Sequence, residues 1–262
     1  MTIRKYSKVI QMNIYNSLEY RINFILNMVS AVVPILIQVF IWTNIFSFNG
    51  INEFKGYSRT NIILYMVIAG SLSKLLSIDN HQKIAGEIKN GGLNQYILKP
   101  VNHTVYWISN EIGGKLIYCL LLYTIFFIIS SINNVNQLNA ILFGGIAMYL
   151  GVIINFLLYY LISMLSFWFL DISSIFTAVH MIFIFLYGGV LPLDILAKAN
   201  NILYYIPFGL TIFFPVRIFS TTIAQHEILF YIFLQVLWIV VLFIVSALLW
   251  KKGFKKYTAI GG

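Results

Sequence analysis

The stretch AILFGGIAMYLGVIINFLLYYLISMLSFWFL, residues 140–170, decides the fold class of this chain because its 31 residues contain no charged side chain. A helix rises 1.5 Å per residue, so this stretch would reach about 46 Å, against a bilayer hydrocarbon core of about 30 Å. It is long enough to cross a membrane and must tilt, bend or project beyond it. A membrane-spanning β-strand would instead alternate polar and apolar residues over about ten positions. We therefore predict an all-α membrane protein.

Further apolar blocks repeat this pattern along the chain. Of the 262 residues, 60% are hydrophobic and 10% are charged, whereas a soluble domain carries about 25% charged residues. The first block is too long for the core of a cleavable signal peptide and lacks a small-residue cleavage site, so we expect it to stay in the membrane. The six predicted spans are residues 22–46, 61–77, 115–132, 140–170, 172–190 and 228–250.

Residues 1–21 are basic and amphipathic. Apolar side chains recur at spacings of three and four, which places them on one helical face. We predict a helix that lies along the membrane surface, the alternative being a short solvated tail. A polar loop, residues 47–59, follows the first span. The apolar positions of the predicted surface helix are Ile3, Tyr6, Ile10, Ile14 and Leu18.

Residues 191–227 are apolar but interrupted by Pro192, Pro207 and Pro215. A full span here would place two prolines and Arg217 in one short helix, and it would put the C-terminal lysines on the side opposite the N-terminus. We therefore predict a re-entrant pair of short helices that enters the outer side of the membrane and returns to the same side.

The basic residues test this topology. If the N-terminus is cytoplasmic, six spans place 13 of the 17 lysine and arginine residues on the inner face, as the positive-inside rule expects. Both termini, and the long hydrophilic segment 78–114, are then predicted to be cytoplasmic. Because these bases flank apolar blocks, they indicate membrane topology and not a nucleic-acid partner.

Motifs for chemistry are absent from the sequence. It contains no P-loop, no zinc-protease motif and no nucleophile elbow, and its single cysteine, Cys119, is interpreted as packing material. We expect no catalytic residue, no cofactor and no metal on this chain. In the fourth span, Gly144, Ala147 and Gly151 share nearly one helical face and predict close packing against a neighbouring helix.

Histidines and one aspartate are the remaining candidates for a polar site. His180 falls inside the fifth span and is the candidate intramembrane polar site, although a neutral histidine bonded to a neighbouring helix also explains it. Asp171 is interpreted as a cap for the fifth helix. His81, His103 and His226 lie in polar segments and are expected on the solvated surface.

The order of these parts resembles that of the type-2 ABC export permeases. Three stretches of the sequence carry the first resemblance, to the segment between the second and third spans of that family. They are Gly86-Glu87-Ile88, Gly91-Gly92-Leu93 with Tyr96, and Leu98-Lys99-Pro100. A second set is similar to the outer re-entrant region of the family. It comprises Gly188-Gly189, Leu191-Pro192-Leu193, Ile206-Pro207-Phe208 and Phe214-Pro215. The chain, residues 1–262, is identified as a member of the small six-span branch without an assigned substrate.

This resemblance implies an exporter subunit with a substrate path lined by the first, second and fifth spans. The high content of Asn, Ile, Lys, Tyr and Phe indicates an AT-rich bacterial genome, and so a bacterial plasma membrane is the expected location. Two such subunits, identical or related, pair and are driven by separate cytoplasmic P-loop ATPase subunits that bind ATP and magnesium. The alternative is an ion-coupled secondary transporter, which would need intramembrane carboxylates, and the predicted apolar blocks contain none. The residues assigned to ATPase coupling are Glu87, Lys89, Leu93, Tyr96 and Lys99, and those assigned to the outer gate are Pro192, Pro207, Phe208 and Pro215. A solvated loop is the competing interpretation of the coupling segment.

Overall fold

The computed structural model describes residues 2–50, 52–76, 79–97, 101–132, 138–169, 171–196 and 202–257. Helices dominate this part of the chain, which confirms the predicted all-α class. The long helices are α2 (Arg21–Asn49), α3 (Arg59–Leu75), α6 (His103–Ile132), α7 (Leu138–Ser163) and α11 (Gln225–Phe254). The shorter ones are α1 (Thr2–Glu19), α4 (Asp79–Lys89), α5 (Asn94–Ile97), α8 (Ser173–Leu186), α9 (Leu193–Leu196) and α10 (Phe213–Ser220). Single 3-10 turns occur at η1 (Met164–Phe167) and η2 (Ile202–Tyr204), and one hairpin joins β1 (Glu53–Phe54) to β2 (Tyr57–Ser58).

Five helical segments among the described residues are long and apolar enough to cross a membrane, so the chain is a multi-pass membrane protein. One lies in α2, one runs over α3 and α4, and the other three lie in α6, α7 and α11. The fifth predicted span, residues 172–190, contains α8, which has only 14 residues and a length of about 21 Å. α8 is followed by Gly188 in the left-handed region at φ 78°, where the chain turns. This fifth span, and with it the total of six, therefore stays a prediction.

The third span starts earlier than predicted. α6 begins at His103, whereas the sequence pattern placed the start of the span at residue 115. Asn102 caps the helix, since its side-chain oxygen accepts a hydrogen bond of 3.0 Å from the Val105 backbone N–H. Residues 103–114 are thus the first turns of a long helix, and the segment predicted to be cytoplasmic is correspondingly shorter.

The polar loop after α2 contains a tight hairpin. Lys55 and Gly56 occupy its turn with φ of 49° and 85°, the positive values that a type I′ turn requires at both central positions. Phe54 pairs with Tyr57 across the turn. Trp42 of α2 meets the Phe54 ring edge-on, with ring centroids 5.7 Å apart, so the hairpin packs on the end of its helix.

α7 lies in the middle of the helices and packs against α6, α10, α11 and α4. Its small residues allow this, as predicted. A Cβ on Gly144 would lie 2.6 Å from the Phe219 ring of α10, and one on Gly151 would lie 2.5 Å from the Thr211 carbonyl oxygen. Ala147 is fully buried, and its carbonyl accepts a hydrogen bond from Gln235 of α11.

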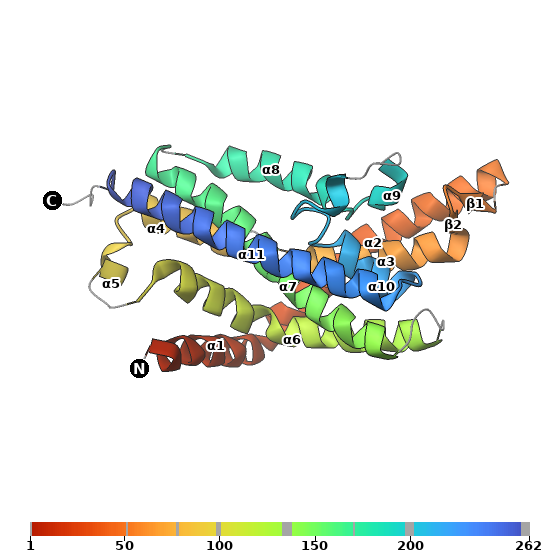
Figure 1. Cartoon of the computed structure of the whole chain (residues 1–262), viewed down its shortest axis with the longest axis horizontal. Helices are drawn as coiled ribbons and strands as arrows, with labels where there is room; N and C mark the ends of the chain where they lie inside the picture. The colour runs from red at the N-terminus through yellow and green to blue at the C-terminus, as the bar shows by residue number, and fades with distance from the viewer. Residues whose placement is uncertain are drawn as a thin grey trace.

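Figure 1 shows the start of α1, the short helix α5 and the end of α11 together at one end of the molecule, with the β-hairpin at the other. α1 packs along the first half of α6. The Asn102 N–H donates to the Tyr6 hydroxyl over 2.9 Å, and the Ser17 hydroxyl donates to the Gly114 carbonyl over 3.2 Å. The amphipathic helix exists as predicted, while its place on a membrane surface stays a prediction.

Candidate coupling segment and outer gate

The predicted coupling segment is a helical hairpin formed by α4 and α5. α4 ends where Gly91 adopts φ 79°, and the Gly92 N–H bonds the Glu87 carbonyl over 2.9 Å. A Cβ on Gly92 would lie 3.1 Å from the Glu87 backbone, so a side chain there would crowd this turn. The two glycines therefore reverse the chain and bring α5 back beside the end of α4.

Glu87 is the centre of the polar contacts in this hairpin. Its carboxylate accepts hydrogen bonds of 3.2 Å from the Tyr96 hydroxyl and from the Gln95 side chain. Burial, and then the neighbouring Glu87 carboxylate, raise the pKa of Tyr96 well above its ordinary value. Tyr96 consequently remains a proton donor to Glu87 throughout the physiological pH range.

His103 connects this hairpin to the long helices. The Thr104 hydroxyl donates to the Tyr160 oxygen over 3.1 Å, and the Tyr160 hydroxyl lies 2.8 Å from His103 Nδ1. His103 Nε2 lies 3.5 Å from a Glu87 oxygen. The ring stacks on Trp250 of α11, with centroids 4.4 Å apart.

The structure brings three of the five predicted coupling residues together at this hairpin. Glu87 and Tyr96 face each other and His103, and Leu93 packs in the core with only 1% of its surface exposed. Lys89 is exposed at the end of α4. Lys99 lies outside the described residues.

Two histidines contradict the prediction of solvated surface. His81 is fully buried and lies 3.2 Å from the Phe156 carbonyl, and His103 is 4% exposed. Both were misassigned because the polarity of neighbouring residues in sequence does not report what distant helices cover. The cap at Asn102, an asparagine just after Pro100, was the available signal that His103 begins a long helix.

A hydrogen bond from Asn80 of α4 to a buried ion pair within α6 connects these two helices. Glu111 is 2% exposed and pairs with Lys115 at the next turn. Its second oxygen accepts a hydrogen bond of 2.6 Å from the Asn80 side chain. This corrects the prediction that the membrane helices lack a carboxylate, because the early start of α6 places Glu111 inside a long helix. The carboxylate is neutralised by its partners.

The predicted outer-gate residues lie in a compact segment between α8 and α11. Pro192, Pro207 and Pro215 are buried. Phe208 packs on Phe183 and Tyr187 at the end of α8, with ring centroids 4.8 Å and 6.1 Å apart. Seven of the eight residues of α10 are buried.

Asp194 joins this outer segment to the β-hairpin and was not singled out from the sequence. Its carboxylate accepts hydrogen bonds from the Tyr57 hydroxyl, over 2.7 Å, and from the Tyr204 hydroxyl. Burial, followed by the hydrogen bond to Asp194, raises the pKa of Tyr57 above its ordinary value. Lys55 also donates to the Ile195 carbonyl over 2.8 Å. No local motif predicts a contact between segments so far apart in sequence.

His180 and Asp171 both have partners. The Tyr159 hydroxyl of α7 lies 2.7 Å from His180 Nδ1, which agrees with the interpretation of a histidine bonded to a neighbouring helix. The Ser173 N–H donates to Asp171 over 2.9 Å, and this bond lowers the pKa of the Asp171 carboxyl. The N-cap position of α8 is Ile172, so Asp171 lies one residue before the position predicted for the cap.

Comparison with known proteins places the chain in a family. No curated protein matches it. A family model described as ABC-2 family transporter protein matches residues 20–261, which is nearly the whole chain. Members of this family are transmembrane permease subunits, and the apolar helices described above fit such a subunit. The chain therefore belongs to the ABC-2 transporter family and is a membrane subunit of an ABC transporter.

Proposed function

We propose that this permease is the transmembrane subunit of an exporter, driven by ATPase subunits on separate chains that hold ATP and magnesium. These ATPases would dock on the α4–α5 hairpin at the cytoplasmic face. The substrate path would form between two permease subunits, identical or related, and be lined by α2, α3 and α8. A bacterial plasma membrane is the proposed location.

One observation supports this proposal most strongly: the polar cluster that attaches the α4–α5 hairpin to three long helices. Glu87 and Tyr96 belong to the hairpin, whereas His103, Tyr160 and Trp250 belong to α6, α7 and α11. Movement of a docked ATPase can reach the membrane only through groups that are rigidly connected to the spans. The 3.5 Å contact between Glu87 and His103, together with the edge-on contact between the Tyr96 and His103 rings at 4.6 Å, provides such a connection.

Within the predicted coupling set, the residues would have two different tasks. Lys89 is exposed and would contact the ATPase directly. Glu87 and Tyr96 face inward and would transmit the movement to His103, while Leu93 would hold the hairpin in the core. Lys99 is retained as a proposed ATPase contact.

The outer segment, residues 191–220, would act as the gate. Its helix α10 has eight residues and a length of about 12 Å, too short to cross the membrane, and it is buried against α7, α3 and α6. These features support a re-entrant arrangement. Pro192, Pro207, Phe208 and Pro215 remain the proposed gate residues, and α8 remains the proposed fifth span.

A labelling experiment tests the sidedness on which this proposal depends. In a Cys119→Ser background, Lys89→Cys and Glu53→Cys place single thiols at exposed positions at opposite ends of the molecule. We expect a membrane-impermeant maleimide to label the Glu53→Cys variant on intact cells and the Lys89→Cys variant only after lysis. Labelling of Lys89→Cys from outside would place the hairpin where no ATPase can dock.

A second experiment tests the docking itself. In complexes co-expressed with a candidate ATPase, Lys89→Glu should reduce ATPase retention about fivefold, since a rim charge contributes about 1 kcal/mol. The matched control, Lys252→Glu, makes the same charge change at the end of α11 and should change retention less than twofold. Equal losses in both variants would show a general charge effect and contradict docking at the hairpin.

The ion-coupled alternative gains one observation, the buried carboxylate of Glu111. Its pairing with Lys115 and Asn80 leaves it without the free site that proton binding requires. Transport by inside-out vesicles should therefore stop when ATP is removed and persist when a protonophore collapses the proton gradient. The reverse result would favour the secondary transporter.

A further inference from the structure

A groove of about 360 Å³ lies between α4 and the connection from α7 to α8, which contains η1. One wall comes from Gln82, Gly86 and Lys89, which share a face of α4 at spacings of four and three. The other wall comes from the connection and from the start of α8. Figure 1 shows this connection at the same end of the molecule as α5 and the end of α11. The groove is therefore at the end where the ATPase is proposed to dock.

Buried contacts hold the two walls of the groove together. α4 packs on η1, and the Ser163 hydroxyl donates to the His81 carbonyl over 3.1 Å. On the α8 side, the buried Phe176 ring stacks on Tyr159 of α7, with ring centroids 6.4 Å apart. A Cβ added to Gly86 would meet nothing within 4 Å, so the space between the walls is open. The groove is thus formed before any partner binds.

Two opposite charges line the groove. Lys89 and Asp171 are both exposed there. The hydrogen bond from Ser173 and, more weakly, the charge of Lys89 lower the pKa of the Asp171 carboxyl, so the two charges act on each other. Neither forms an ion pair within the part of the chain that the structure describes. Lys89 can therefore pair with an acidic side chain of a partner, and Asp171 with a basic one.

Exposed aromatic rings lie beside these charges. Trp168 and Phe169 directly follow η1 and are 37% and 54% exposed. Tryptophan is enriched among the residues that dominate binding energy in protein interfaces, and such residues are surrounded by a polar rim. A preformed groove with unpaired charges next to exposed aromatic rings is consequently typical of a surface that binds a protein.

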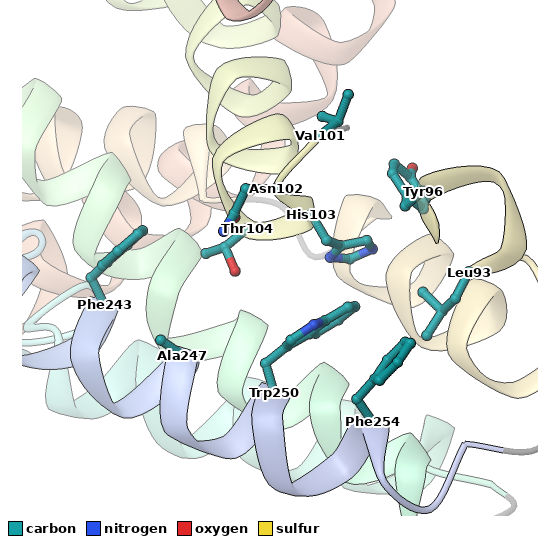
Figure 2. Close-up of a pocket in the computed structure, with 10 residues that line it drawn as sticks. All are labelled: Leu93, Tyr96, Val101, Asn102, His103, Thr104, Phe243, Ala247, Trp250 and Phe254. Atoms are coloured by element: carbon teal, nitrogen blue, oxygen red, sulfur yellow. The ribbon is translucent and has the colours of Figure 1, made fainter. Parts of the chain in front are cut away.

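The other side of the hairpin packs on the long helices of this chain. Figure 2 shows Tyr96 on one side of the His103 ring and Trp250 of α11 on the other, and the ring centroids lie 4.6 Å and 4.4 Å from that of His103. Leu93 is 1% exposed on the same side. A partner that binds the hairpin therefore has the face of α4 at the groove available to it.

We propose that this groove is a second part of the ATPase docking surface and receives a segment of the ATPase that carries an acidic, a basic and an apolar side chain. The acidic side chain pairs with Lys89, the basic one pairs with Asp171, and the apolar one contacts Trp168. This inference rests on the proposed function and adds to it the α7–α8 connection, which the sequence pattern did not assign to coupling. An ATPase seated here acts directly on the start of α8, the proposed fifth span and a wall of the proposed substrate path.

Photo-crosslinking tests this proposal in the complex of the full-length permease with the co-expressed candidate ATPase. We expect p-benzoylphenylalanine in place of Trp168 to cross-link to the ATPase. The matched control is the same amino acid in place of Phe254, which is 39% exposed and lies at the end of α11 on the other side of the hairpin. Its yield should be at least fivefold lower. Equal yields, or cross-links from position 168 to lipid alone, would overturn the proposal.

Substitutions measure the contribution of the groove to ATPase retention. Gly86→Phe fills the groove and should reduce retention at least tenfold. Gly114→Phe, in α6, is the matched control and should change retention less than twofold, because a Cβ at either glycine meets nothing within 4 Å. Asp171→Asn removes the charge but keeps an oxygen for the Ser173 N–H, and it should reduce retention about fivefold.

The outcomes separate the groove from docking at the hairpin in general. If Lys89→Glu weakens retention while Gly86→Phe and Asp171→Asn stay within twofold of wild type, docking at the hairpin stands and the groove proposal is wrong. If Lys89→Glu has no effect, or wild type retains no ATPase, both proposals fail. Equal losses in Gly86→Phe and Gly114→Phe would show a general effect of the added ring and would also overturn the groove proposal.

Discussion

Replacing Gly151 by alanine tests how closely α7 must approach the outer segment. The new Cβ would lie 2.5 Å from the Thr211 carbonyl oxygen and 3.3 Å from the Thr211 carbonyl carbon. These atoms belong to a backbone that cannot rotate away as a flexible side chain can. The shorter contact is about 1 Å below the optimum for non-bonded heavy atoms. Either α7 or the outer segment must therefore shift.

The change in the free energy of unfolding caused by Gly151→Ala follows from two opposing effects. Overpacking of this kind destabilises a protein by about 1–3 kcal/mol. Alanine favours a helix over glycine by about 1 kcal/mol, which offsets part of that cost. The net loss is then at most about 2 kcal/mol, and the apparent unfolding temperature should fall by up to about 8 °C, using the shift of about 2–4 °C per kcal/mol for chains of similar size.

Thermal unfolding in detergent measures this effect, with Gly114→Ala as the matched control. Gly114 lies inside α6, and a Cβ there would meet nothing within 4 Å. Its replacement should raise the unfolding temperature by about 2–4 °C through helix propensity alone. If Gly151→Ala unfolds at or above the temperature of Gly114→Ala, the inferred close contact with Thr211 is wrong.

Two other substitutions test polar contacts. Asp194→Asn removes the negative charge that accepts two tyrosine hydrogen bonds, each worth about 1.5–3 kcal/mol. Hydrogen exchange in the β-hairpin should therefore accelerate at least tenfold. The control Glu53→Gln, on the same hairpin, should leave the exchange rate unchanged. Glu111→Gln should destabilise the permease by about 3 kcal/mol in detergent unfolding because it leaves the Lys115 ammonium unpaired, and adding Lys115→Met should recover most of that loss. Failure of the second change to rescue the first would mean that Glu111 matters for reasons other than its ion pair.

The long helices could be predicted from sequence because a long apolar stretch in a membrane protein has few structures available to it other than a helix. The close packing of α7 was also predictable, since Gly144, Ala147 and Gly151 share a face at helical spacing. Cys119 is buried with 3% of its surface exposed, as expected of packing material. The helical break at Gly91 followed from the conformational freedom of glycine.

The contacts of the candidate sites were not predictable, because they join residues distant in sequence. His103 was expected on the surface, yet Trp250 and Tyr160 cover it from two other helices. Asp194 and Tyr57 form a hydrogen bond although they too are distant in sequence. The sequence showed which side chains were polar, but only the packing of helices determines which of them become neighbours.

The contact between α1 and α6 has a consequence for how the protein is made. α1 is synthesised before α6, against which it finally packs, because α2, α3 and the α4–α5 hairpin lie between them in the chain. On the membrane surface predicted for α1, lipid would cover its apolar side chains, such as Ile10 and Ile14, until α6 emerges. The bilayer would then hold α1 in place during biogenesis until its packing partner has been made.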